Sequence, residues 1–262
     1  MKGLYVALNT ELIKTLRSKM LWATIIFFTF ISIMLGFLML VAKHPEIAGE
    51  SAVLSIKASL ISKADWPTYF WLLMQMVLTV GSIGPAIVAI WVFGREYSDR
   101  VIKDLLALPV SRSMIVFSKF IIAFAWSLLL LLLLYVLGIL CGLIIHLDGW
   151  GRELFVQKTL TYFVSAVLTI LLFPVISLIT CISRGYLLPV GIAILILIAT
   201  QFIFLGLPSL TPYFPWAIPG LYSGIAGPLS PKAGVISYVI LGLTSLLSIT
   251  GTLAWLRYAD QH

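Results

Sequence analysis

Six apolar runs dominate the sequence, and each is long enough to cross a lipid bilayer as a helix. A spanning helix needs roughly 20 apolar residues, because the hydrocarbon core is about 30 Å thick. We place the runs at about residues 20–42, 69–93, 120–145, 159–181, 187–206 and 234–256. Backbone groups in lipid must be hydrogen-bonded within the segment, which favours helices. We therefore expect an all-α integral membrane protein with a single transmembrane domain over residues 1–262.

The composition agrees with this expectation, since 61% of the residues are hydrophobic and only 10% are charged. Soluble domains average about 25% charged residues. The net charge of +7 would favour nucleic acid as a partner of a soluble protein, but here lipid is the expected surrounding and no nucleic-acid partner is expected. Most of the 17 Lys and Arg residues lie on the side that carries both termini. The positive-inside bias then predicts cytoplasmic termini.

Two segments outside the spans have patterns of their own. Leu4, Leu8, Leu12 and Leu16 recur every fourth residue before the first span. This predicts either an amphipathic helix on the inner membrane surface or a cytoplasmic extension of the span.

Residues 206–231 hold several prolines and aromatics, and the prolines exclude one continuous helix. We expect short broken extracellular helices that enter the outer leaflet, or an ordinary loop with interfacial aromatics.

Several chemistries have no candidate residues in this sequence. The spans as drawn contain no Asp, Glu, Lys, Arg or His, which argues against self-powered proton-coupled transport. Sodium coupling through carbonyls and hydroxyls stays open. No lysine follows a glycine, so the chain lacks the phosphate-binding loop that ATP hydrolysis requires. We expect no catalytic, cofactor or metal site in this chain.

The charged stretch "FGREYSDRVIKDLLALPVSR" separates the second and third spans. It predicts a helix over about residues 97–108, with Ser98 or Asp99 as its N-cap and Pro109 as its end. Its apolar stripe comprises Val101, Ile102, Leu105, Leu106 and Leu108, whereas Arg100, Lys103 and Asp104 lie largely opposite. Such a helix suits a groove in a soluble partner or the lipid interface, and it can also simply join two spans.

This stretch resembles the cytoplasmic coupling segment of type-2 ABC-exporter permeases. The matching residues are Glu96, Leu105, Leu106, Pro109, Ser111, Arg112 and Lys119. Arg100 and Val101 stand where the family usually has Gly-Thr. The stretches "ADWPTYF" and "PYFPWAIP" are similar to the bacitracin-resistance type of permease.

The resemblance implies a permease in a bacterial plasma membrane that pairs with a second copy or a homologue. Each chain would bind a separate ABC ATPase subunit, which holds ATP and Mg²⁺, and would export an amphipathic drug, peptide antibiotic or lipid-like molecule. The residues expected to couple the two subunits are Glu96, Tyr97, Asp99, Arg100, Val101, Asp104, Leu105, Leu106, Pro109 and Arg112. The alternatives are a non-transporting accessory or sensor subunit and a channel or secondary carrier.

Two amides inside the spans are candidates for a substrate path or for helix packing, and two glycines are candidates for close helix contact. Gln75 and Gln201 are the only amides within the spans as drawn. Amides in lipid either hydrogen-bond between helices or face a polar path. Gly138 and Gly142 form a GxxxG pattern, which permits close approach of a second helix.

Prolines mark possible hinges in two spans. Pro85 and Pro174 are expected to kink spans two and four. Ser177 and Thr180 follow Pro174 and are expected either to satisfy carbonyls freed near it or to line a path.

Overall fold

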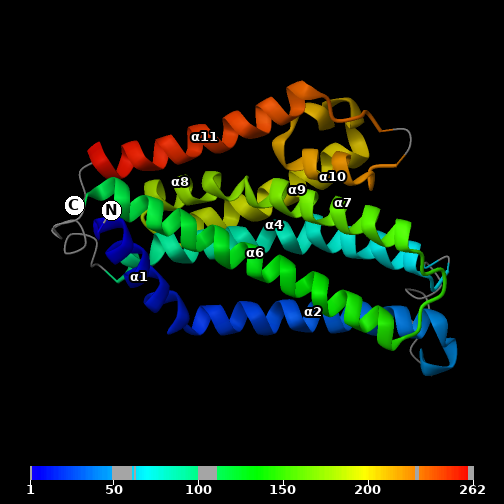
Figure 1. Ribbon diagram of the computed structural model, residues 1–262. Helices are drawn as coiled ribbons and strands as arrows, with labels where there is room; N and C mark the ends of the chain where they lie inside the picture. Colours follow the sequence, from blue (N-terminus) through cyan, green and yellow to red (C-terminus); the bar gives the residue numbers. More distant parts are fainter. Residues whose placement is uncertain (1, 49–60, 62, 100–110, 228–229, 259–262) are drawn as a thin grey trace.

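Six helical segments form an elongated bundle in the computed structural model, which describes residues 2–48, 61, 63–99, 111–227 and 230–258. The segments long and apolar enough to cross a bilayer are α2 (Lys19–Lys43), α4 (Trp66–Ser98), α6 (Arg112–Ile144), α7 (Arg152–Ile170) with α8 (Phe173–Ser183), α9 (Leu187–Gly206) and α11 (Val235–Tyr258). Both termini lie at the same end of the bundle, here called the terminal end (Figure 1). No strand occurs among the described residues, so the all-α, six-span prediction is confirmed.

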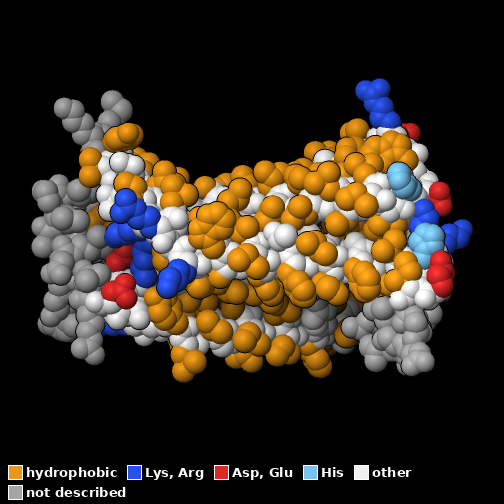
Figure 2. Space-filling model, turned by 90° about the horizontal axis from the view of Figure 1, so that it is seen from below, with side chains coloured by type: hydrophobic (Ala, Val, Ile, Leu, Met, Phe, Trp, Pro, Cys, Tyr) orange, Lys and Arg blue, Asp and Glu red, His pale blue; other side chains and the backbone are white. Residues whose placement is uncertain are grey.

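The surface of the bundle has the polarity that a membrane requires. Figure 2 shows a face on which apolar side chains cover the middle, whereas acidic and basic side chains gather at the two ends. Individual large apolar side chains of α2 are widely exposed, including Trp22 at 61% and Ile26 at 66%. In water such exposure would be unfavourable, but lipid tails solvate it.

The helices α2, α4 and α6 begin after residues whose side chains accept a hydrogen bond from one of the first free N–H groups. The Ser18 hydroxyl accepts a hydrogen bond from the Met20 N–H at 2.9 Å and starts α2. The Asp65 carboxylate does the same for α4, and Ser111 is the N-cap of α6. These caps are typical Ser and Asp positions. The helix α4 continues beyond its apolar run to Ser98, and α6 begins before its apolar run, at Arg112.

The N-terminal segment is a separate helix, α1 (Lys2–Leu16), which packs mainly against α6 (Figure 1). Its buried face carries Ala7, Glu11 and Thr15, which lie one turn apart. Leu12 and Leu16 are exposed at 43% and 57%. The expected helix therefore exists, and its position on the membrane surface stays a prediction.

Close contact between α4 and α6 depends on two glycines of α6. A Cβ atom at Gly138 would lie 2.5 Å from Leu73 Cδ2, and one at Gly142 would lie 2.7 Å from the Trp66 ring. Neither distance is possible for real side-chain carbons. The GxxxG pattern thus allows α6 to approach α4 more closely than larger residues would permit.

Span four consists of two helices. The chain leaves α7 after Ile170 and enters α8 at Phe173, with Pro174 in the first turn of α8. Pro174 has no N–H to donate to the carbonyl four residues earlier, which explains why the helix breaks there. The kink predicted at Pro174 is confirmed as a break, whereas Pro85 lies inside the continuous helix α4.

The proline-rich segment forms the short helices η2 (Pro208–Tyr213), η3 (Pro215–Ala217) and α10 (Ile218–Ser223). Ile218 packs with Leu172 and Leu241, and Trp216 lies against this group. Leu172 lies at the break in the middle of span four, so the segment reaches inward to that depth. Figure 1 shows that α9 and α11 end short of α4 and α7, which leaves room for these helices. Short broken helices before the last span are thus observed.

Candidate functional site

The described part of the chain contains an ion-pair cluster at the terminal end of the bundle. It comprises Glu11 and Lys14 of α1, Arg95 and Glu96 of α4, and Lys119 of α6. Four of these residues are buried, with Glu11 and Glu96 each only 2% exposed. Charged residues are seldom buried unless they are paired, and here the pairs join three helices.

Glu96 and Lys119 form the centre of the ion-pair cluster. The Lys119 Nζ atom donates to both Glu96 carboxylate oxygens, at 2.6 and 2.7 Å. It also donates to the Val92 carbonyl oxygen at 3.0 Å and lies 3.4 Å from Glu11 Oε1. An ammonium group has three N–H donors, so Lys119 is fully hydrogen-bonded inside the protein.

Arg95 and Lys14 connect this centre to α1. The Arg95 Nη2 atom donates to the Glu11 carboxylate, and its Nε lies 3.4 Å from Glu96 Oε1. The guanidinium carbon lies 4.4 Å from the centroid of the Trp91 ring, within cation–π range. Lys14 Nζ lies 3.4 Å from Glu96 Oε1. With three cations and two carboxylates, the cluster carries a formal charge of about +1 when all groups are ionised.

Stability alone is a weak explanation for this cluster. Taking charges out of water costs about as much as their attraction returns, whereas removing one partner of a buried pair costs about 3–5 kcal/mol. Buried pairs therefore favour one arrangement of their helices over others. We regard the ion-pair cluster as a candidate functional site because it joins α4 and α6, the two helices that flank residues 100–110 in the sequence.

The first residues predicted to couple to an ATPase lie at the end of α4. Glu96 is buried in the ion-pair cluster, and half-buried Tyr97 lies in the last turn of the helix. The Asp99 N–H donates to the Arg95 carbonyl oxygen at 2.8 Å, which makes Asp99 the C-cap of α4. Tyr97 and Ser98 belong to α4, so the predicted separate helix does not begin at Tyr97, and most of its predicted range lies outside the described residues.

Of the remaining predicted coupling residues, one lies among the described residues and six lie outside them. Arg112 follows the loop and donates from Nη1 to the carbonyl oxygens of Leu256 at 3.2 Å and Arg257 at 3.1 Å. It thus caps the C-terminal end of α11, where a cation is favourable. The residues Arg100, Val101, Asp104, Leu105, Leu106 and Pro109 lie outside the described residues. Their coupling role stays a prediction.

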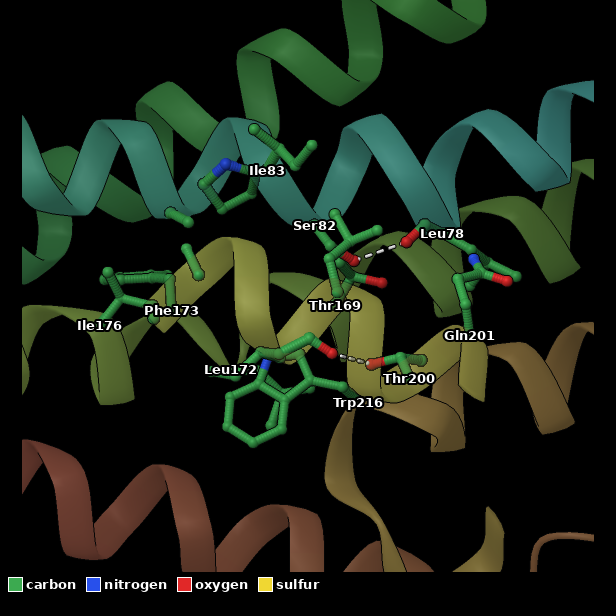
Figure 3. Close-up of a pocket in the computed structure, with 15 residues that line it drawn as sticks. Leu78, Ser82, Ile83, Thr169, Leu172, Phe173, Ile176, Thr200, Gln201 and Trp216 are labelled. Atoms are coloured by element: carbon green, nitrogen blue, oxygen red, sulfur yellow. Dashed lines mark hydrogen bonds between the residues drawn. The ribbon is translucent and has the colours of Figure 1, made fainter. Parts of the chain in front are cut away.

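A second candidate site is a pocket between α4, α8 and α9, at the break in span four (Figure 3). Its volume of about 30 Å³ is enough for a small polar group or a water molecule. Drug-sized ligands occupy pockets of about 300–1,000 Å³, so the observed pocket cannot hold such a molecule entirely. Its polar and aromatic lining comprises Ser82, Thr169, Phe173, Thr200, Gln201 and Trp216.

The structure brings two of the predicted path and hinge residues to this pocket and places the others elsewhere. Gln201 and Pro85 line it, whereas Gln75 lies on α4 outside its lining. Ser177 and Thr180 are fully buried in α8. Their hydroxyls donate to carbonyl oxygens one turn earlier in the same helix, at 3.4 and 2.7 Å, so neither satisfies the carbonyl freed by the proline.

Sequence reasoning missed Glu11, Lys14 and Arg95 in the ion-pair cluster, and Ser82, Thr169 and Thr200 in the pocket. No pattern in the sequence distinguished Glu11, because it lies seven residues after Leu4 and three after Leu8, on the same helix face as these leucines. For the hydroxyl residues there was no signal, because Ser and Thr occur at many span positions.

Two comparisons with known proteins match most of the chain. The family model for ABC-2 family transporter proteins matches residues 7–200, about three quarters of the chain. The bacitracin transport permease protein BCRB of Bacillus licheniformis is 25% identical over 190 residues, which cover 72% of this chain and 89% of that protein. The matched range includes every residue of the ion-pair cluster.

Proposed function

Since the chain belongs to the ABC-2 family of transporter proteins, we propose that it is the permease subunit of an ATP-driven exporter. Membership makes it a multi-pass transmembrane subunit of an ABC transporter, and such subunits associate with ATPase subunits. Outward transport and the nature of the cargo go beyond membership. The family match over residues 7–200 is the observation that carries the proposal.

The fuel would come from separate ATPase subunits that bind ATP and Mg²⁺. These subunits would contact the segment around residues 97–112, on the cytoplasmic side together with both termini. The ion-pair cluster supports this assignment, because Glu96 and Lys119 lie on the two sides of that segment. A force on the loop would act on α4 and α6 at once.

The same contacts define which helices would move together. Glu11 connects α1 to Arg95 and Lys119, and Arg112 connects the start of α6 to the end of α11. Displacement of the loop would therefore shift α1, α4, α6 and α11 as one unit. The pocket beside Pro85 and the break at Pro174 lies where this unit meets α8 and α9.

A second copy of the chain or a homologue would complete the transport path. Only Pro189 is buried among the residues of α9, all of which are described. Leu195, Ile198 and Phe202 are 64%, 59% and 67% exposed. Part of this apolar face would pack against the partner permease, and the rest would face lipid.

The proposed cargo is amphipathic, such as a drug, a peptide antibiotic or a lipid-like molecule. The similarity to a bacitracin transport permease supports peptide antibiotics in particular. A path with apolar walls and a few hydroxyl groups suits molecules that combine apolar and polar parts.

The test is co-purification with an ATPase encoded by a neighbouring gene, followed by reconstitution in proteoliposomes. We expect ATP-dependent accumulation of a fluorescent peptide antibiotic, and loss of resistance in a deletion strain. Transport by the purified chain alone, driven by an imposed proton gradient, would show that the proposal is wrong.

A further inference from the structure

The pocket at the break in span four presents hydrogen-bond acceptors without competing donors from its hydroxyls. Ser82, Thr169 and Thr200 each donate their hydroxyl proton to the carbonyl oxygen four residues earlier, at 2.7, 2.8 and 2.7 Å. A hydroxyl has one proton and two lone pairs. The three protons are therefore engaged, and the lone pairs remain to accept from a ligand.

The three hydroxyls come from three of the helical segments that are long and apolar enough to span a membrane. Ser82 lies midway along α4, and Thr169 lies at the break in span four and is 4% exposed. In Figure 3, Ser82 and Thr169 lie next to each other, and Thr200 approaches from α9. Water is scarce at this depth, so unused acceptors there favour a ligand that brings its own donors.

The volume of the pocket and the Trp216 ring further restrict which ligands can bind. A volume of about 30 Å³ admits a small head group and excludes a bulky one. A primary ammonium group has three N–H donors, which equals the number of hydroxyl acceptors. The Trp216 ring also lines the pocket, and an indole face attracts cations. A trimethylammonium group would gain the ring contact but has no N–H to donate.

We propose that this pocket binds the primary ammonium group of an amphiphile. The apolar part of the amphiphile would lie along the apolar remainder of the lining, which includes Ile83 and Ile196. Gln201 at the exposed side would contact the amphiphile where it leaves the pocket. That such an amphiphile is also cargo rests on the proposed function, whereas the binding itself does not.

The experiment compares two probes that share one alkyl chain, dodecylammonium and dodecyltrimethylammonium. Binding to the purified chain in lipid nanodiscs is measured by equilibrium dialysis, and empty nanodiscs supply the lipid background. We expect the primary amine to bind at least about tenfold more tightly, since hydrogen bonds to charged groups contribute that much or more.

Substitutions then assign the preference to the pocket. Thr200→Val should weaken dodecylammonium binding about tenfold and leave dodecyltrimethylammonium binding unchanged. Ser82→Ala should act in the same direction from a different helix. The matched control is Thr244→Val on α11, because that hydroxyl is also half-buried and donates to its own helix at 2.7 Å, but lies outside the pocket.

The proposal is overturned if the unsubstituted chain binds both probes equally, or if Thr200→Val and Ser82→Ala retain the full preference. Binding is measured without ATPase or ATP, so the two proposals fail separately. A preference that depends on Thr200 in a chain that shows no ATP-driven transport would support the site and contradict the exporter. ATP-driven transport by a chain without any binding preference would support the exporter and contradict the site.

Discussion

Replacing Lys119 by methionine tests whether the ion-pair cluster holds α4, α6 and α1 in one arrangement. The Lys119 side chain is 3% exposed. Methionine retains most of its apolar stem and removes the ammonium group. The change deletes two contacts of 2.6 and 2.7 Å to Glu96, one of 3.0 Å to the Val92 carbonyl oxygen and one of 3.4 Å to Glu11. Removing one partner of a buried ion pair costs about 3–5 kcal/mol, and we expect a loss of unfolding free energy in that range.

A double-mutant cycle separates the pair from the individual residues. Glu96→Gln alone should also destabilise the protein, because it leaves Lys119 buried without its main carboxylate. The combination Glu96→Gln with Lys119→Met should cost less than the sum of the single changes, by about 0.5–3 kcal/mol. The matched control Lys19→Met removes an exposed lysine at the same end and should change stability by less than about 0.5 kcal/mol.

The assays are denaturation of the purified chain in detergent micelles and ATP-driven transport in proteoliposomes. We expect the single variants to retain ATP hydrolysis by the partner subunit but to move less cargo per ATP. Exchanging the charges, as Glu96→Lys with Lys119→Glu, should recover part of both stability and transport. Additive single and double variants, together with unchanged transport by Lys119→Met, would refute the reasoning.

Three further predictions address packing, the end of α11 and the loop. Gly138→Ala places a Cβ 2.5 Å from a side-chain carbon of α4 and should destabilise by about 1–3 kcal/mol in thermal denaturation, whereas Gly242→Ala, with no atom within 4 Å, should be neutral or slightly stabilising. Arg112→Ala removes two hydrogen bonds to the end of α11 and should cost about 1 kcal/mol in the same assay, and an unchanged melting temperature would contradict the capping role. Leu105→Asp should leave membrane insertion intact and abolish cargo-stimulated ATP hydrolysis, so wild-type export by this variant would count against the coupling segment.

Hydropathy was sufficient to predict the number of spans and their centres, because each span is an apolar run. It was insufficient for the ends of α4 and α6. Those helices continue past the apolar runs, since backbone hydrogen bonding depends on local conformation and not on polarity. Arg95, Glu96 and Lys119 are therefore inside helices and buried, although hydropathy alone placed them in a loop. Their pairing depends on tertiary contacts between α1, α4 and α6, which no local pattern encodes.

The pocket likewise has one feature that was predictable from the sequence and others that were not. Pro174 predicted a break in span four from local chemistry alone, and the break is observed. The meeting of Ser82, Thr169 and Thr200 required the packing of α4, α7 and α9 around that break. Gln201 was identified because amides are rare in spans, whereas hydroxyl residues are too frequent to distinguish. The rarity of amides in spans was therefore a useful signal in the sequence, whereas the proximity of the hydroxyl residues was visible only in the structure.

The position of Pro85 connects the two candidate sites. It lies in α4 between the ion-pair cluster and Ser82, and its side chain lines the pocket. Proline removes one backbone hydrogen bond from a helix, so α4 bends most easily there. Glu96 is 11 residues farther along α4, about 16 Å at 1.5 Å per residue, so a displacement at the cluster acts on Pro85 through that lever arm.

Bending at Pro85 would change the pocket directly, because Ser82 and Ala86 line it on either side of the proline. Pro85→Ala supplies the missing N–H and should stiffen α4. We expect this variant to be as stable as the unsubstituted chain or more so, and to move less cargo per ATP. If the variant transports normally while Lys119→Met does not, the motion passes from the cluster to the pocket without a bend in α4.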